Sequence, residues 1–167
     1  MPTDTMCPSQ TQPSGSNGVA KPDIKLTLVA NLSDKNIGQF KKMNSACFPV
    51  TYHENFYSKI LEYDFTALAY VQDVMVAGVA CRIEPPESEG EKPKCCVMTL
   101  CVLKPYRRYG IASLLLKWVF DELERRSCGC GQVKLQVQTS NEEALTFYQS
   151  HGTFFFNFEF RIKKAKF

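Results

Sequence analysis

The chain has 167 residues, of which 44% are hydrophobic and 22% charged, and its formal net charge is +3 at pH 7. This composition is typical of one globular domain that buries its own core, and it excludes a fully disordered, collagen-like or coiled-coil chain. The charge is too small to favour nucleic-acid binding. Without a run of about 18 apolar residues, we expect neither a transmembrane helix nor a membrane partner.

Residues 1–22 are rich in Pro, Ser and Gly and show no apolar periodicity. They predict a disordered leader, followed by one folded domain over residues 23–167. Because this leader has no apolar stretch of the kind found in secretory signal peptides, we expect an intracellular protein.

The eight cysteines include no C-x-x-C pair, and only two histidines accompany them. We therefore expect reduced thiols that fill the core, and no metal site. The segment Cys128-Gly129-Cys130 is the best candidate for a disulfide or a metal ligand, although a glycine-rich turn explains it more simply.

The first third of the chain predicts a strand followed by two helices. Residues 24–29 alternate between apolar and polar side chains, which is the period of a half-buried strand. Ser33 or Asp34 is placed to cap the next helix. Apolar side chains three residues apart mark one face of that helix: Ile37, Phe40 and Met43. Pro49 ends it, and a second short helix covers residues 56–61.

Three β-rich segments follow. Residues 67–71 and 74–83 flank the short turn Gln72-Asp73 and predict a hairpin. After a charged loop over residues 84–94, residues 95–103 are apolar on both faces. That pattern is typical of a central strand that is covered above and below.

The last third alternates helices and strands. A helix begins after Gly110, and its apolar side chains follow the helical period: Ile111, Leu114, Leu115, Trp118, Val119 and Leu123. Residues 133–138 predict a strand, residues 140–143 a capping box for the next helix, which Gly152 ends. Residues 153–160 predict an aromatic strand before a basic tail. The resulting order, β-α-α-β-β-β-α-β-α-β, predicts a layered α/β domain.

The junction between the central strand and the helix after Gly110 predicts an anion site. Glycine lets a ligand approach the backbone, and the first turn of a helix presents N–H groups and the positive end of its dipole. Arg107 and Arg108 add positive charge. A pyrophosphate fits such a nest. The alternative is an ordinary helix start with two solvated arginines.

Two motifs in this half of the chain resemble the GCN5-related N-acetyltransferase (GNAT) superfamily. That family carries an Arg/Gln-x-x-Gly-x-Gly/Ala loop after its fourth strand, which Arg107, Gly110 and Ala112 match. It also carries an Asn-x-x-Ala-x-x-Phe-Tyr helix. The residues that match this helix are Asn141, Ala144, Phe147 and Tyr148. Two linked motifs in the right order are a specific signal. They imply the GNAT fold, a mixed central sheet flanked by helices, with a splayed central strand pair that binds acetyl-CoA.

Further segments resemble the San-type N-alpha-acetyltransferases, the catalytic subunits of NatE, from about Ile24 to Gly152. The segments are Phe48–Tyr52, Met98–Leu100, Leu103–Arg108 and Val137-Gln138. The resemblance implies that the substrate is a protein N-terminus, with Met followed by an apolar residue. It implies that the substrate is held by Phe48, Pro49, Val50, Tyr52 and Met98. A helix-breaking proline among buried aromatic residues is the alternative explanation of the first segment.

The same resemblance implies which residues bind acetyl-CoA and carry the reaction. The cofactor-binding set is Leu100, Cys101, Val102, Arg107, Arg108, Tyr109, Gly110, Ile111, Ala112, Asn141 and Tyr148. Backbone N–H groups near Leu100 to Val102 would polarise the thioester carbonyl. Tyr148 would protonate the leaving thiolate, as the family's equivalent tyrosine is proposed to do. Its alternative role is that of a buried structural tyrosine.

The chain departs from the San type at two further candidate catalytic positions. Where that family has a tyrosine and a histidine to handle the amine proton, this chain has Cys96 and Gln136. Glutamine is no base, and cysteine is one only as a thiolate. An α-amine, with a pKa of about 7.7–8.0, is still roughly a tenth or more neutral at pH 7, against about one part in 10³ for lysine. The departure therefore predicts a slow enzyme rather than an inactive one.

The leading hypothesis is an active N-alpha-acetyltransferase in the cytoplasm, with the nucleus as a second compartment. One alternative is a catalytically weak subunit that binds acetyl-CoA; another is an acetyltransferase for lysine or small amines. A nucleic-acid binder, through the aromatic and basic C-terminal segment, is the least favoured. For a San-type protein we expect a partner in the large auxiliary subunit of the ribosome-associated NatA complex.

Overall fold

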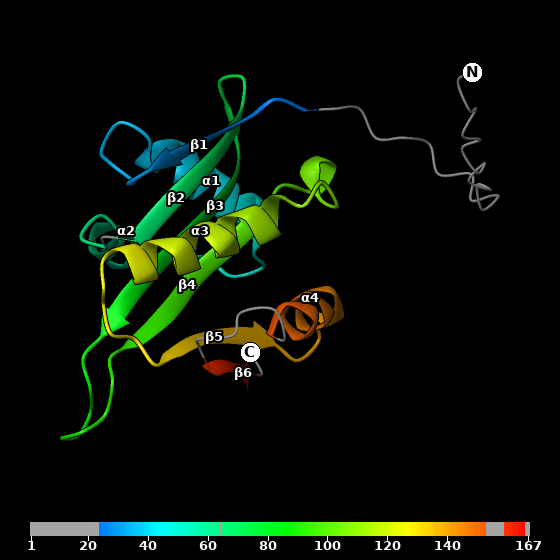
Figure 1. The fold of residues 1–167 in the computed structure, drawn as a ribbon. Coiled ribbons are helices and arrows are strands. Elements are labelled where there is room, and N and C mark those ends of the chain that lie inside the picture. Colours follow the sequence, from blue (N-terminus) through cyan, green and yellow to red (C-terminus); the bar gives the residue numbers. More distant parts are fainter. Residues whose placement is uncertain (1–23, 64, 153–158, 166–167) are drawn as a thin grey trace, which may run out of the picture.

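The computed structural model describes residues 24–63, 65–152 and 159–165 as one α/β domain (Figure 1). The order of elements along these residues is the predicted one, with a short 3₁₀ turn, Lys104–Tyr106, added before the third helix. The predicted leader over residues 1–22 lies outside the described residues.

The described strands form a single six-stranded mixed sheet in chain order. They are β1 (Leu26–Ala30), β2 (Phe65–Val71), β3 (Val74–Glu84), β4 (Lys94–Val102), β5 (Gln132–Gln138) and β6 (Glu159–Ala165). The first four pair antiparallel, whereas β5 is parallel to β4 and β6 is parallel to β5. The predicted hairpin is confirmed, because Val71 pairs with Val74 across Gln72-Asp73.

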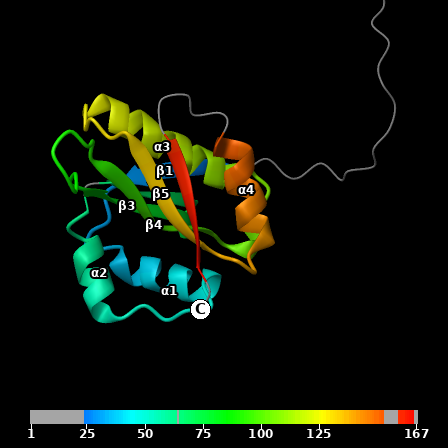
Figure 2. The same cartoon turned by 90° about the horizontal axis from the view of Figure 1, so that it is seen from below.

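The helices cover both faces of the sheet (Figure 2). Helices α1 (Ile37–Cys47) and α2 (Glu54–Ile60) lie on one face, and α3 (Ile111–Arg125) lies on the other. Helix α4 (Glu142–Gly152) lies near α3, and its Tyr148 belongs to the same apolar core. Both faces of β4 are therefore covered, as its apolar sequence predicts.

The two central strands pair along only part of their length. The β4–β5 pairing ends at Val97 opposite Leu135, although β4 runs on to Val102 and β5 to Gln138. On the other edge of β4, the register with β3 shifts where Thr99 and Val97 pair with consecutive residues. A bulge of this kind bends and twists a strand locally. The strands then diverge toward α4, as Figure 1 shows.

Only part of the helix-cap prediction is confirmed. Helix α1 begins at Ile37 after Asn36, without a side-chain cap on its first N–H groups. Ser33 still begins the turn that leads into it, because Ile37 N donates to Ser33 O at 2.9 Å and Asn36 Oδ1 accepts from Ser33 N at 2.8 Å. Helix α4 is capped by Asn141, whose Oδ1 accepts from Ala144 N at 3.1 Å, rather than by Ser140. Several polar residues precede each helix, and only the path of the incoming chain decides which one caps it.

The apolar stripe of α3 is also rotated from the predicted one. Leu114 is 41% exposed, whereas Leu116 and Phe120 are buried beside the predicted Ile111, Leu115, Val119 and Leu123. The stripe is centred on the residues that meet the sheet, which the helical period alone does not fix.

The predicted aromatic strand over residues 153–160 falls mostly on residues 153–158, which lie outside the described residues. The last described strand is β6, Glu159–Ala165. Most of the predicted basic tail is thus part of a strand, because pairing with β5 satisfies its backbone groups.

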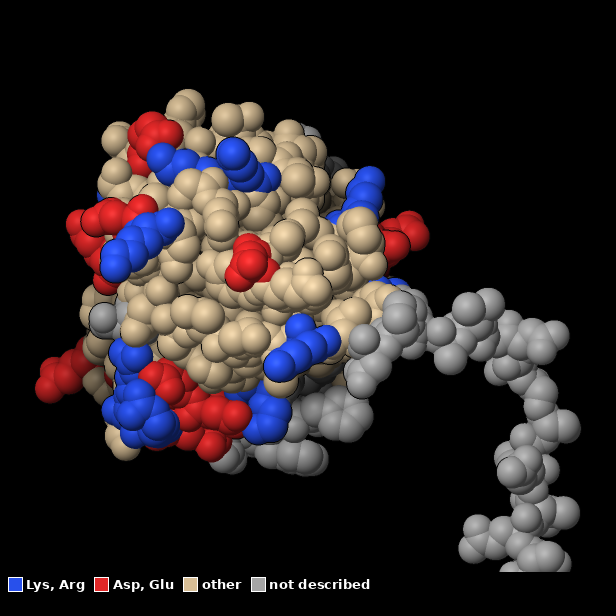
Figure 3. Space-filling model, turned by 90° about the horizontal axis from the view of Figure 1, so that it is seen from above, with Lys and Arg blue, Asp and Glu red and all other residues tan. Residues whose placement is uncertain are grey.

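Surface charge follows no single sign on the face seen in Figure 3, where basic and acidic side chains are interspersed over a mostly uncharged surface. Nucleic-acid-binding domains instead cluster their basic residues. Among the described helices, none combines the length and the apolar character that crossing a bilayer requires.

Substitution of two adjacent leucines tests this packing. Leu115 is 0% exposed, so Leu115→Ala is expected to lower the free energy of unfolding by about 2–5 kcal/mol. Leu114→Ala is the matched control, because the neighbouring leucine is 41% exposed; its effect is expected to be within about 0.5 kcal/mol. Urea unfolding followed by circular dichroism measures both, and equal losses would contradict the rotated stripe.

Candidate active site

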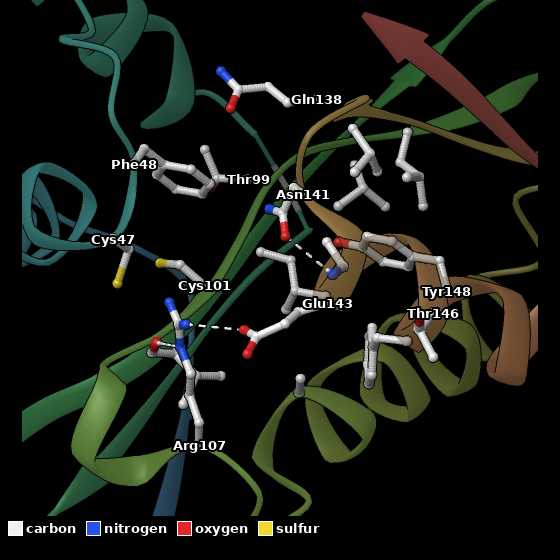
Figure 4. Close-up of a pocket in the computed structure, with 18 of the residues that line it drawn as sticks. Cys47, Phe48, Thr99, Cys101, Arg107, Gln138, Asn141, Glu143, Thr146 and Tyr148 are labelled. Atoms are coloured by element: carbon white, nitrogen blue, oxygen red, sulfur yellow. Dashed lines mark hydrogen bonds and ion pairs between the residues drawn. The ribbon is translucent and has the colours of Figure 1, made fainter.

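A cleft of about 930 Å³ opens where β4 and β5 separate (Figure 4). Its walls come from the C-terminal half of β4, the start of α3, β5, α4 and the segment that joins α1 to α2. Backbone N–H and C=O groups along this part of β4 have no partner strand on the β5 side. Because backbone groups need hydrogen-bond partners, the open edge is suited to a ligand that supplies them.

The start of α3 forms the anion end of the cleft. Gly110 has φ 76°, and a Cβ atom placed there would meet no atom within 4 Å, so the space in front of it is open. No side chain caps the helix, and its first turn contains no acidic residue. Gly110, Ile111 and Ala112 all line the cleft. The helix dipole and backbone donors therefore favour a negatively charged group here.

The two predicted arginines, Arg107 and Arg108, line the anion end of the cleft. Arg107 Nε donates to Val102 O at 3.2 Å, and its guanidinium lies 3.3 Å from a carboxylate oxygen of Glu143 on α4 (Figure 4). Arg108 has φ 67° and lines the cleft. Tyr109, by contrast, is not among the lining residues and packs on the core.

Strand β4 forms the floor of the cleft. The predicted residues Met98, Leu100, Cys101 and Val102 all line it. Thr99 lines it as well and is 2% exposed, yet among the described residues its Oγ1 has no hydrogen-bond partner. A buried hydroxyl without a partner costs about 1–3 kcal/mol, so this position is set up for a polar group that enters the cleft.

Helix α4 brings Asn141 and Tyr148 to the opposite wall. The Asn141 side chain caps its own helix, and this fixes where the helix starts. Tyr148 is 8% exposed, and burial raises the pKa of its phenol above the ordinary value. The phenol therefore keeps its proton throughout the neutral range, as a proton donor must.

The segment between α1 and α2 forms an aromatic wall. Phe48, Pro49, Val50 and Tyr52 line the cleft as predicted. The Tyr52 ring stacks on Phe56 at 4.2 Å between centroids, and its edge meets Phe48 at 5.8 Å. Such contacts hold the rings in one arrangement and leave an apolar surface for a ligand.

Of the two positions that depart from the San type, one lines the cleft and the other does not. Gln136 on β5 is exposed and lines the cleft. Cys96 on β4 is not among the lining residues; it lies opposite Arg82 of β3, within hydrogen-bonding reach of Glu84. Burial, with the Glu84 carboxylate second, raises the pKa of the Cys96 thiol to about 12. At neutral pH this thiol is protonated and accepts no proton.

Three lining residues have features that the sequence motifs do not indicate: Cys47, Thr99 and Glu143. Thr99 had a detectable signal, as a polar residue within an otherwise apolar strand. Cys47 and Glu143 had none, because their partners Cys101 and Arg107 are far away in the sequence. Among the described residues, no group of three or more His, Cys, Asp or Glu side chains is placed to hold a metal ion.

Comparison with known proteins agrees with this geometry. The sequence pattern of the Acetyltransferase (GNAT) family matches residues 37–153. The chain is 38% identical over 125 residues to N-alpha-acetyltransferase 50 of Danio rerio, which covers 74% of this chain and 72% of that protein. It is 34% identical over 125 residues to the probable N-acetyltransferase san of Drosophila melanogaster, with 74% and 66% covered.

Among solved structures, Naa50 of Arabidopsis thaliana in complex with the bisubstrate analogue CoA-Ac-MVNAL is similar, with a TM-score of 0.65 and 39% identity. The match covers 76% of this chain and 82% of that one. The ribosomal-protein-S18-alanine N-acetyltransferase of Escherichia coli shares the fold at a TM-score of 0.64 and 20% identity, over 77% of each chain. By its sequence and its structure, this chain belongs to the GNAT acetyltransferase family, and within it to the N-alpha-acetyltransferase 50 and San group.

Proposed function

We propose that this N-alpha-acetyltransferase prefers protein N-termini that begin with Met followed by an apolar residue. The observation that carries the proposal is the aromatic wall of Phe48, Pro49, Val50 and Tyr52, which faces the cleft together with Met98. An apolar wall of fixed rings favours apolar side chains at the first two positions of the peptide. The analogue bound to the Arabidopsis relative carries the peptide MVNAL, which supports the same preference.

The chain is an acetyltransferase that uses acetyl-CoA, and the residues of the cleft fit that cosubstrate. When bound, it supplies an acetyl group as a reactive thioester. The open start of α3, with Gly110 and the two arginines, would hold the diphosphate. The unpaired edge of β4 near Leu100 to Val102 would donate backbone hydrogen bonds to the thioester carbonyl.

Proton handling in this cleft follows from the pKa values of its groups. The substrate α-amine, with a pKa of about 7.7–8.0, loses its own proton near neutral pH. Gln136 can orient the amine or a water molecule through its amide but accepts no proton. Tyr148, buried and protonated, would donate a proton to the leaving thiolate. The thiol of Cys96 carries its proton and serves the strand pair rather than the reaction.

The cellular setting is proposed from the resemblance to San-type proteins. We place the chain in a NatE assembly in the cytoplasm, or also in the nucleus, docked on the large auxiliary subunit of the NatA complex. Co-precipitation with that subunit tests this placement.

A weakly active subunit is the second candidate function, and the observation that favours it is the pair Cys96 and Gln136.

One paired experiment tests the proposed function. Calorimetry with acetyl-CoA and mass-spectrometric detection of acetyl transfer use the same purified full chain. We expect binding, and transfer to the α-amine of a Met-Leu peptide faster than to a Ser-Ala peptide. An N-terminally blocked peptide with one lysine is the control. Faster acetylation of that lysine would contradict the proposal, and binding without any transfer would favour the second candidate.

The role of Gln136 is tested by its pH profile. In the unchanged protein, kcat/KM is expected to rise through the amine pKa, about 7.7–8.0. The variant Gln136→His adds an imidazole with a pKa of about 6.5, and we expect it to increase kcat at least about ten-fold, since a general base contributes about 10²–10⁴-fold. Gln138→His, two residues along the same strand, is the matched control. An equal gain in both variants would show that position 136 has no special role.

The ion pair between Arg107 and Glu143 gives a further prediction. Glu143 places a negative charge in a cleft that binds an anion, at 3.3 Å from Arg107. We expect Glu143→Gln to lower the Kd of acetyl-CoA by up to about five-fold, because an exposed ion pair contributes at most about 1 kcal/mol. Glu89→Gln, on the exposed β3–β4 loop, is the control. Weaker binding of Glu143→Gln in calorimetry would contradict this interpretation.

A further inference from the structure

The cleft wall contains two cysteine side chains that the acetyl-transfer reaction does not use. Cys47 is the last residue of α1, and Cys101 lies on β4 beyond the bulge. Both line the cleft. In Figure 4 the Cys101 side chain points toward Cys47, on the side of the cleft away from Tyr148. The sequence separates the two residues by more than an entire hairpin, so only the fold brings them together.

The two thiols are neighbours on the cleft wall. Cys101 Sγ donates to Asn44 Oδ1 at 3.4 Å, one turn before Cys47 on α1. The nearby Cys101 side chain lowers the pKa of the Cys47 thiol, and the positive charge of Arg107 acts in the same direction. The interaction with Cys47, together with burial, raises the pKa of Cys101. Cys47 is therefore the more easily ionised of the two thiols.

Solvent exposure also distinguishes Cys47, the attacking thiol, from Cys101, the resolving thiol. Cys47 is half-buried and open to the cleft, whereas Cys101 is 6% exposed beneath α1. A thiolate that a reagent can reach is the attacking group in thiol–disulfide exchange, and a neighbouring protected thiol can then resolve the adduct.

We propose that Cys47 and Cys101 form a thiol-modification site, at which a small-molecule disulfide such as oxidised glutathione converts the pair into an intramolecular disulfide and stops peptide acetylation. The Cys47 thiolate attacks one sulfur of the reagent, a mixed disulfide forms, and one thiol of the reagent leaves. Cys101 then loses its proton and attacks the Cys47 sulfur, which expels the second thiol. Two protein thiols are oxidised, and one disulfide is reduced to two thiols.

Two other cysteine pairs serve as internal comparisons. Cys81 and Cys95 also lie within hydrogen-bonding reach of each other, but both are 0% exposed, and the contact and burial raise the pKa of Cys95. Cys130 lies two residues from Cys128, and burial raises the pKa of its thiol to about 11. The first pair has no accessible thiol, and in the second the pKa of Cys130 is raised rather than lowered.

The effect on activity follows from the position of Cys47. It directly precedes Phe48, the first residue of the aromatic wall. A covalent bond to β4 would fix this end of the wall against the floor of the cleft, where the peptide N-terminus is proposed to lie. This part of the inference rests on the proposed function, whereas formation of the disulfide does not.

The experiment treats the reduced full chain with a glutathione redox series and maps cysteines by mass spectrometry without reduction. We expect a cross-link between the peptides that contain Cys47 and Cys101 before any modification of Cys81 or Cys95. Acetyl transfer is expected to fall in parallel and to recover with dithiothreitol. The mapping gives its answer even if the reduced chain fails to acetylate the peptide tested.

Two variants separate the steps. Cys101→Ser is expected to stop at a glutathione adduct on Cys47, and Cys47→Ser is expected to leave Cys101 unmodified. If the first cross-link in the unchanged protein joins other cysteines, or if Cys47 reacts no faster than Cys130, the site is wrong. A cross-linked protein that still acetylates the peptide at the full rate would overturn the proposed loss of activity. The cross-link mapping and the activity of the cross-linked protein are both measured on the unsubstituted chain. They are therefore informative even if a variant fails to fold.

Discussion

The loss of pairing between β4 and β5 beyond Val97 and Leu135 is the constraint on which the rest of the site depends. A parallel pair inside a sheet normally satisfies the backbone groups of both strands. Here the bulge on β4 turns the strand away, and the exposed backbone edge becomes the floor of the cleft. A continuous β4–β5 ladder would leave no space for a thioester and no backbone donors to polarise it.

The same bulge sorts the side chains of β4 between the two faces of the sheet. Cys101 contacts Asn44 of α1, so it faces the helices that carry the aromatic wall, and Thr99 shares that face by strand alternation. Leu100 packs instead with the core under α3. The anion end at α3 and the apolar end at α1 are thereby separated by the thickness of one strand. This separation allows a charged cosubstrate and a peptide to approach the same backbone segment from opposite sides.

Sequence reasoning was most successful where a local pattern has one physical solution. The Gln72-Asp73 hairpin, the helix after Gly110 and the aromatic segment around Pro49 are such cases, and the last two each form part of the cleft wall. It failed where the outcome depends on distant partners. Leu114 faces solvent because the sheet contacts a different side of α3, and Cys96 lies away from the cleft because β3 holds it beside Glu84. The spacing of residues along the sequence does not predict contacts with such distant partners.

The pair Cys96 and Gln136 has a consequence for substrate choice as well as for rate. Of these two residues only Gln136 lines the cleft, and its amide accepts no proton, so the proposed reaction favours an amine that is already neutral. The pKa values of a lysine and an α-amine differ by about 2.5 units, which corresponds to about 3.4 kcal/mol. A cleft that handles the amine proton poorly therefore penalises lysine by about two to three orders of magnitude relative to a protein N-terminus. With glutamine at position 136, the proposed reaction favours the substrate that needs a base least.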